Sequence, residues 1–131
     1  MNRFDNKNYL YTDLTKEIIG AFYNVYNSLG YGFLEKVYHN AMLIELKKLG
    51  LKFESEQSIK VYYDGIIVGD YIADIIVEQK VIVELKAVSK LNQKHEVQLV
   101  NYLKGTGIPV GLLLNFGEEP DQRRKVLSSK N

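Results

Sequence analysis

The pattern of hydrophobic positions changes near Gly50, from spacings of three and four residues to a spacing of two. Before that point the apolar residues predict two amphipathic helices, over residues 14–29 and 34–49. Thr12 or Asp13 can cap the first helix, and Gly30 suits the left-handed position that ends it. The residues expected to face the core are Leu14, Ile18, Ala21, Phe22, Val25 and Leu29 in the first helix and Leu34, Val37, Tyr38, Met42 and Leu46 in the second.

After Gly50, short runs of β-branched and aromatic residues predict strands. Asp64-Gly65 lies between apolar runs and predicts a hairpin over residues 59–68, because a type I′ turn needs positive φ at both central positions. The remaining predicted elements are strands over residues 71–77, 81–86 and 110–115 and a helix, capped by Asn92, over residues 93–104. This order predicts an α/β fold with a mixed central sheet flanked by helices.

Composition limits the classes of protein to which the chain can belong. Its 131 residues suit one domain, and its 46% hydrophobic and 25% charged residues are ordinary for a globular protein. We predict a single domain over residues 1–131, with loosely held polar ends at about residues 1–11 and 117–131. The sequence has no Cys, which excludes thiol nucleophiles and zinc sites built on Cys.

Charge and hydropathy give expectations about location and partners. The first residues are polar, and no apolar run approaches the ~20 residues that span a bilayer, so we expect a cytoplasmic protein without membrane association. A net charge of +1 is low for a protein that binds nucleic acid through a broad basic surface. Basic residues cluster at Lys86, Lys90 and Lys94 and at residues 123–125, a pattern that is typical of a solvated face.

Three ionisable residues interrupt the most apolar predicted strands: Asp74, Glu84 and Lys86. A buried carboxylate needs a partner charge, hydrogen bonds or a metal ion. If the turn at residues 78–80 pairs the two strands, Asp74 and Glu84 converge on an oxygen-rich site that suits Mg²⁺. An internal salt-bridge network of the three residues explains the same pattern, and the spacing alone does not separate the two interpretations.

These three residues resemble the signature of the PD-(D/E)XK nucleases, although Ala73 stands where that signature has Pro. Gly32, Glu35 and Tyr38 have the spacing that names the GxxExxY proteins, a small bacterial and archaeal family within that superfamily. Further segments similar to this family lie at residues 44–46, 74–77, 83–87, 95–103 and 111–116. The resemblance extends over residues 14–126 and implies a restriction-endonuclease-like core in the order α, β, β, β, α, β, with an extra N-terminal helix.

The resemblance also implies roles for individual residues. Asp74 and Glu84 would bind the metal ion, together with the backbone carbonyl of Leu85. Lys86 would act on the attacking water and on the charge that develops on the phosphate. Glu35 resembles a helical acid that completes the metal site in many members; it is equally explained as an acid that favours the helix dipole.

Gln98 and Tyr102, four residues apart on one helical face, resemble the Q-x-x-x-Y pair of RecB-like nucleases and would act in catalysis. His95, Lys90 and Tyr38 are candidates for contact with substrate. Ordinary explanations stay open: Tyr102 and Tyr38 can be core residues, and His95 can be a helix-capping group.

The function implied is that of a Mg²⁺-dependent nuclease, with Mn²⁺ as a substitute, that hydrolyses phosphodiester bonds of nucleic acid, with DNA as the expected substrate. One alternative is a non-catalytic module that keeps the fold and binds nucleic acid or protein. Another is a nuclease subunit that binds DNA as a homodimer or with a partner protein. The near-neutral charge favours these alternatives, and the complete set of Asp74, Glu84 and Lys86 favours an active enzyme.

Overall fold

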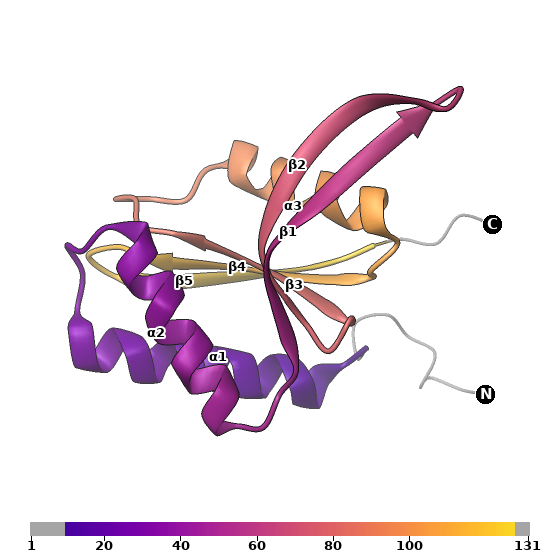
Figure 1. Ribbon diagram of the computed structural model, residues 1–131. Coiled ribbons are helices and arrows are strands. Elements are labelled where there is room, and N and C mark those ends of the chain that lie inside the picture. The colour runs from indigo at the N-terminus through magenta and orange to yellow at the C-terminus, as the bar shows by residue number, and fades with distance from the viewer. Residues whose placement is uncertain (1–9, 128–131) are drawn as a thin grey trace, which may run out of the picture.

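A mixed β-sheet lies between helices in the computed structural model, which describes residues 10–127 (Figure 1). The expected α/β architecture is confirmed. The elements are α1 Thr12–Leu29, α2 Glu35–Lys48, β1 Phe53–Tyr63, β2 Ile66–Val77, β3 Val81–Lys86, α3 Gln93–Thr106, β4 Val110–Phe116 and β5 Pro120–Val126. Within these described residues, no helix is long and apolar enough to cross a membrane.

Helix α1 has the apolar face that its sequence predicts, with Ile18 and Phe22 fully buried. Its N-cap residue is Tyr11, in the left-handed conformation, so the expectation that Thr12 or Asp13 caps the helix is wrong. Gly30 ends the helix as expected, with φ of 69°, a conformation that costs glycine little because it has no Cβ.

Helix α2 departs from its predicted inner face at its start. Leu34 is 80% exposed and Val37 is 37% exposed, although both were expected in the core. Leu34 is the N-cap residue and precedes the first turn, so its side chain is not part of the helix face that packs. Val37 lies about 100° around the helix from Tyr38, which is fully buried and takes the inward position.

The strands follow one another across the sheet in chain order, β1-β2-β3-β4-β5. All neighbouring strands are antiparallel except β3 and β4, which are parallel and are connected by α3. The predicted turn at Asp64 and Gly65 is confirmed, with φ values of 53° and 76°. Strand β2 is continuous through residues 66–77, so β1 and β2 form a long hairpin that extends beyond the rest of the sheet (Figure 1).

Two hydrophobic cores lie on opposite faces of the sheet. The core under α1 and α2 contains Phe22, Tyr38 and Phe116, and the Tyr38 ring stacks on Phe116 with a centroid distance of 4.2 Å. The core under α3 contains Leu99 and Leu103. Burial of these apolar side chains on both faces is the main stabilising contribution to the fold.

The position of α3 depends on both its cap and its packing. Asn92 caps the helix as expected: its side chain accepts a hydrogen bond from the His95 backbone N–H, and the His95 ring accepts one from the Asn92 N–H. Leu99 packs directly over Gly111 of β4, where a Cβ atom would lie 2.7 Å from the Leu99 side chain. A residue larger than Gly at position 111 would push α3 away from the sheet.

The C-terminal segment differs from the sequence expectation. The polar end was expected to be loosely held from Gly117, but Pro120–Val126 form strand β5, paired antiparallel with β4. Most β5 side chains are polar because the strand lies at the edge of the sheet, where one backbone edge is unpaired and charges protect against association. The other parts of the expected polar ends, residues 1–9 and 128–131, lie outside the described residues.

Candidate active site

The candidate site forms where β2 and β3 separate. The two strands pair at Val77 with Val81, Ile76 with Ile82 and Ile75 with Val83. At the next position of this register lie Asp74 and Glu84, where hydrogen bonds between side chains and backbone take the place of the backbone pairing. The Asp74 N–H donates to Glu84 Oε2 at 2.9 Å, and the Leu85 N–H donates to Asp74 Oδ2 at 2.8 Å. Each carboxylate therefore holds the backbone of the opposite strand.

A local irregularity of β2 turns Asp74 towards β3. Ala73 and Ile75 are two apart, so a regular strand would place them on one face. Ala73 lies in the core under α3, whereas Ile75 lies in the core under α1 and α2. Pairing with β1 skips Asp74 and the opposite residue Glu56, whose φ is 55°, an uncommon value for a residue other than glycine. The strand thus changes faces at Asp74.

The two carboxylates are buried unequally and repel each other. Glu84 is only 5% exposed. Burial and then the charge of Asp74 raise the pKa of Glu84 to about 8. Burial also raises the pKa of Asp74, and the hydrogen bond from Leu85 offsets part of that effect. The pair therefore favours a bound proton or a cation in its vicinity.

Lys86 is partly buried two residues beyond Glu84 on β3. Its positive charge lowers the pKa of both Asp74 and Glu84, although the effect of burial on each carboxyl is larger. The strand thus places a cation within electrostatic reach of the two acids, but among the described residues Lys86 forms an ion pair with neither of them. A closed internal salt-bridge network does not form.

A pocket of about 130 Å³ opens beside Asp74, between the start of α2 and strands β1, β2 and β3. Glu35, on the first turn of α2, lines this pocket, and its charge adds to the shift that raises the pKa of Glu84. The complete lining is Glu35, Lys36, His39, Glu56, Asp74 and Leu85. The structure thus places Glu35 and Leu85 beside Asp74.

His39 and Glu56 line the pocket but were not among the residues selected from sequence. His39 is 6% exposed, and its Nε2 lies 3.3 Å from the Asp74 carbonyl oxygen and 3.1 Å from Ser55 Oγ. Within the described residues, His39 Nδ1 is buried without a hydrogen-bond partner. The sequence could have indicated His39, since it lies one helical turn after Glu35 and therefore on the same face of α2. It could not have indicated Glu56, because the position of Glu56 depends on the irregularity of the strands.

Gln98 and Tyr102 lie on the other side of the site, in a groove of about 420 Å³ between α3 and Tyr71 of β2. Tyr102 connects the groove with the carboxylates: burial, and then the charges of Glu84 and Asp74, raise its pKa to about 12. Tyr102 therefore keeps its proton at neutral pH and remains a hydrogen-bond donor. Gln98 lines the groove beside Tyr102 and not the pocket at Glu35.

The remaining three candidates lie apart from the carboxylates. Tyr38 is fully buried, and its hydroxyl donates to the Gly30 carbonyl at 2.7 Å and accepts from the Phe33 N–H at 3.1 Å. The expectation that Tyr38 contacts substrate is therefore wrong, because its polar group serves the loop between α1 and α2. Lys90 lines a separate depression near β5.

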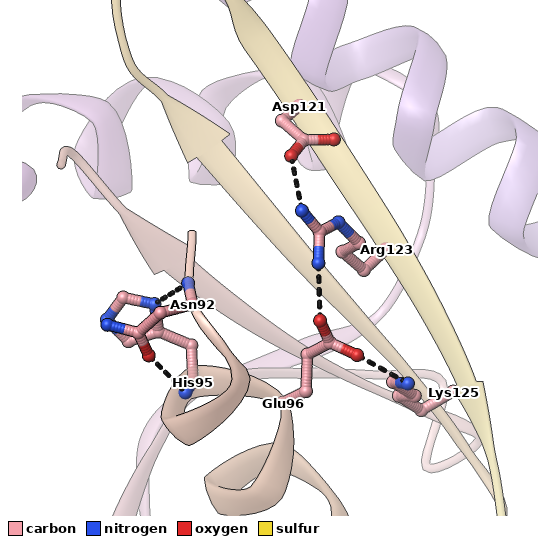
Figure 2. A network of polar contacts seen from close by, with 6 residues as sticks. All are labelled: Asn92, His95, Glu96, Asp121, Arg123 and Lys125. Atoms are coloured by element: carbon pink, nitrogen blue, oxygen red, sulfur yellow. Dashed lines mark hydrogen bonds and ion pairs between the residues drawn. The ribbon is translucent and has the colours of Figure 1, made fainter. Parts of the chain in front are cut away.

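His95 belongs to the helix cap, as Figure 2 shows. The same figure shows Glu96, the next residue, bound to Arg123 and Lys125 of β5. Both ring and backbone of His95 are thus explained by capping, the interpretation that competed with substrate binding.

The residues at the site fit a divalent cation on chemical grounds. The described residues contain no group of three or more acidic or His side chains arranged to hold a metal ion. Mg²⁺, however, is commonly bound by one or two carboxylates, with water and substrate phosphate in the remaining positions. A pair of carboxylates with raised pKa values, buried at Glu84 and partly buried at Asp74, beside a pocket lined by His39, is suited to such a cation.

Comparison with known proteins gives one family match and a fold likeness. The model of the PD-(D/E)XK nuclease superfamily matches residues 12–126. The crystal structure of SSO0001 is similar with a TM-score of 0.56 and 17% sequence identity, over 92% of this chain and 62% of that one. At this identity the likeness concerns the fold alone, and the chain spans less than two thirds of that structure. No curated protein matches the chain.

Proposed function

The chain belongs to the PD-(D/E)XK nuclease superfamily, and from this membership we propose that it is a divalent-metal-dependent nuclease. The observation that carries the proposal is the convergence of Asp74 and Glu84 at the separation of β2 and β3. The α/β fold is consistent with the restriction-endonuclease-like architecture of that superfamily. Nucleic acid is the substrate class that follows, and we propose DNA as the substrate.

Asp74 and Glu84 would hold the cation, with the Leu85 carbonyl as a further ligand and Glu35 at the rim. Mg²⁺, or Mn²⁺ in its place, supplies positive charge that stabilises the phosphate and activates water when bound. Because the carboxylates are preorganised by hydrogen bonds to opposite strands, they lose little freedom when they bind a cation.

Lys86 and Tyr102 would act on the substrate. In the reaction, the water oxygen attacks phosphorus, the bond to the leaving oxygen breaks, and the water proton passes to solvent while the leaving oxygen takes one up. Lys86 stabilises the negative charge that develops on the phosphate oxygens. Tyr102, whose pKa is about 12, remains protonated and donates a hydrogen bond from the groove side, with Gln98 beside it.

The finer assignments are part of the same proposal. Gly32, Glu35 and Tyr38 support membership in the GxxExxY family. The buried Tyr38 gives that motif a structural reason, since its hydroxyl holds the loop that precedes Glu35. A cytoplasmic location and a single domain are proposed on the sequence evidence alone.

A second candidate function is a binding module that keeps the fold without catalysis. The observation that favours it is the net charge of +1, which gives little general attraction to a polyanion. The two functions differ in one measurable property, because the proposed nuclease breaks phosphodiester bonds when a divalent cation is present and a binding module breaks none.

The test is a cleavage assay on single- and double-stranded DNA and RNA, with Mg²⁺ or Mn²⁺ and with excess chelator. We expect cleavage only with the cation, and a loss of at least about 100-fold in Asp74→Asn. Glu17→Gln, an exposed acid on α1, is the matched control and should keep wild-type activity. Cleavage that persists in chelator, or equally in Asp74→Asn, would contradict the proposal. A lack of cleavage on every substrate would favour the binding module.

A further inference from the structure

The long β1–β2 hairpin leaves an apolar surface uncovered. Its outer part, which we call the hairpin arm, comprises residues 58–72 and projects from the body of the sheet (Figure 1). Large hydrophobic side chains are exposed along it, at 47–70% of their area: Tyr62, Tyr63, Ile66, Ile67, Val68 and Ile72. A two-stranded ribbon in water is only marginally stable by itself. The exposed hydrophobic side chains of the arm would therefore be stabilised if another surface covered them.

One face of the arm is already covered by α3. Ile59 and Tyr71 are paired across the strands and therefore point to the same side. Ile59 is buried against α3, where a Cβ at Gly105 would lie 3.1 Å from its Cγ2, and the Tyr71 ring lies 5.5 Å from the Tyr102 ring. We call this covered side the inner face.

The opposite side, the outer face, carries the alternate cross-strand pairs. These are Ser58 with Ile72, Lys60 with Asp70 and Tyr62 with Ile67. The Lys60 ammonium is 3.3 Å from the Asp70 carboxylate at the centre of the face, between the apolar side chains of Ile72 and of Tyr62 and Ile67. Among residues 10–127 this face is left uncovered: α3 packs on the inner face, and Tyr62, Ile67 and Ile72 are exposed on the outer one.

We propose that the outer face of the hairpin arm is the interface of a homodimer, covered by the same face of a second copy of the chain. Three large hydrophobic side chains on this face, Tyr62, Ile67 and Ile72, are 47–59% exposed. A standard interface buries about 800 Å² per partner, so these side chains would form its apolar centre and not its whole area.

The arrangement of charge identifies a second copy as the partner. A two-fold dimer requires a self-complementary surface: if one residue of the first copy contacts a second residue of the other copy, the reverse contact is made as well. The outer face has one cation and one anion, so a two-fold axis between them places Lys60 against Asp70 of the second copy, with the apolar groups meeting on either side. A nucleic acid is disfavoured, because the arm contains one Lys and two Asp, Asp64 and Asp70, and lacks the positive charge that phosphates attract.

The proposal is tested by sedimentation velocity of the full chain over a series of concentrations. Wild type should have twice the 15.1 kDa mass of the chain, and Ile72→Glu should weaken dimerisation at least tenfold, because a charge enters the apolar interface. Ile44→Glu is the matched control: this isoleucine on α2 is 61% exposed, against 59% for Ile72, and its variant should remain dimeric. Far-UV circular dichroism establishes that each variant is folded.

A second experiment tests the face without altering its apolar residues. Lys60→Asp and Asp70→Lys each leave two like charges on the face, so each variant alone should be mainly monomeric. Mixed together they are complementary and should form a heterodimer of the wild-type mass. The proposal would be overturned if the wild type were monomeric at every concentration, or if Ile72→Glu dimerised as strongly as the wild type. So would a monomer that binds duplex DNA through the arm, since the face would then be a nucleic-acid surface.

Discussion

At the scale of single residues, the site is defined by an unfavourable interaction that the fold maintains. Glu84 is buried beside the partly buried Asp74, and burial, followed by the charge of Asp74, raises the pKa of Glu84 to about 8. Each acid also stabilises the opposite strand by accepting a backbone hydrogen bond. Removal of one charge should therefore stabilise the metal-free protein, while complete removal of either side chain would leave a backbone donor unsatisfied.

Glu84→Gln tests this balance through the pH dependence of stability. Between its unfolded pKa near 4.5 and its folded pKa of about 8, Glu84 binds a proton more tightly in the folded state. Its contribution is therefore fully present below pH 4.5 and is lost as the pH rises to 8. In excess chelator, Glu84→Gln should gain stability over wild type between pH 5 and pH 8, by on the order of 1 kcal/mol or more.

The measurement is urea unfolding at the two pH values, with Glu17→Gln as the matched control for loss of an exposed carboxylate. Added Mg²⁺ should stabilise wild type more than Glu84→Gln, because the proposed cation site would exist only in the folded state and would lose one charged ligand in the variant. An equal difference between wild type and Glu84→Gln at pH 5 and pH 8 would show that the folded Glu84 is not protonated in this range.

Lys86→Ala separates cation binding from chemistry. In the proposed reaction, Asp74 and Glu84 would supply the negative charge that holds a metal ion, whereas Lys86 is itself a cation and would act on the phosphate. The variant should lose about 100-fold or more of the cleavage rate and keep its affinity for Mn²⁺, or bind it more tightly because a like charge has left. Calorimetric titration and the cleavage assay measure the two effects. Lys47→Ala, an exposed lysine on α2, is the control; a parallel loss of metal binding and cleavage in Lys86→Ala would refute the separation.

At the scale of elements, β5 and α3 depend on a charge cluster. Glu96 of α3 binds Arg123 and Lys125 of β5, and Arg123 also bonds Asp121 at 3.0 Å (Figure 2). Hydrogen bonding from Lys125 is the largest of the effects that lower the pKa of Glu96. The cluster attaches the edge strand to the helix that carries Gln98 and Tyr102.

Glu96→Gln should destabilise the protein at neutral pH and not in acid. A lowered pKa contributes stability above the unfolded value, near 4.5, and that contribution is lost as the pH falls through the folded value. The stability difference between wild type and the variant should therefore shrink below pH 4.5. Because Glu96 is partly exposed, high salt should reduce the difference at neutral pH as well. Thermal unfolding at pH 7 and pH 3.5 measures it, and an equal difference at the two pH values would show that the ionised form of Glu96 does not stabilise the folded state.

The elements also show where a hydrophobic pattern predicts structure and where it does not. Helix α1, the Asp64-Gly65 turn and strands β3 and β4 have strong local signals and lie where expected. Strand β5 has no such local signal, because its side chains are mostly polar. The hydrogen bonds between its backbone and β4 hold it in place instead. Leu34 and Val37 fit a helical spacing, but the packing of α2 places Tyr38 inward instead.

At the scale of the whole molecule, the site depends on contacts that sequence spacing cannot give. The pattern indicated that Asp74 and Glu84 come together, since both interrupt apolar strands that a short turn connects. It did not indicate that β2 changes faces at Asp74, and so it did not identify Glu56 or the buried His39. Both residues reach the pocket through tertiary packing of α2 and β1 around that irregularity.

The proposed active site and the proposed dimer interface lie on the same hairpin. The pocket at Asp74 lies at the base of the hairpin, and the arm begins two residues further out, at Ile72. The tests remain distinct, because dimerisation is measured by mass in chelator and nuclease activity by cleavage. A monomeric, metal-dependent nuclease would contradict only the dimer, and an inactive dimer would contradict only the nuclease.

Metal binding by Asp74 and Glu84 is tested most directly by a crystal structure of the protein soaked in Mn²⁺, with anomalous diffraction to locate the ion. We expect an anomalous peak between the carboxylates of Asp74 and Glu84, within bonding distance of about 2.1–2.3 Å of both, and no peak there in Asp74→Asn. Density for Mn²⁺ only elsewhere on the protein, or none between these carboxylates at saturating Mn²⁺, would contradict it.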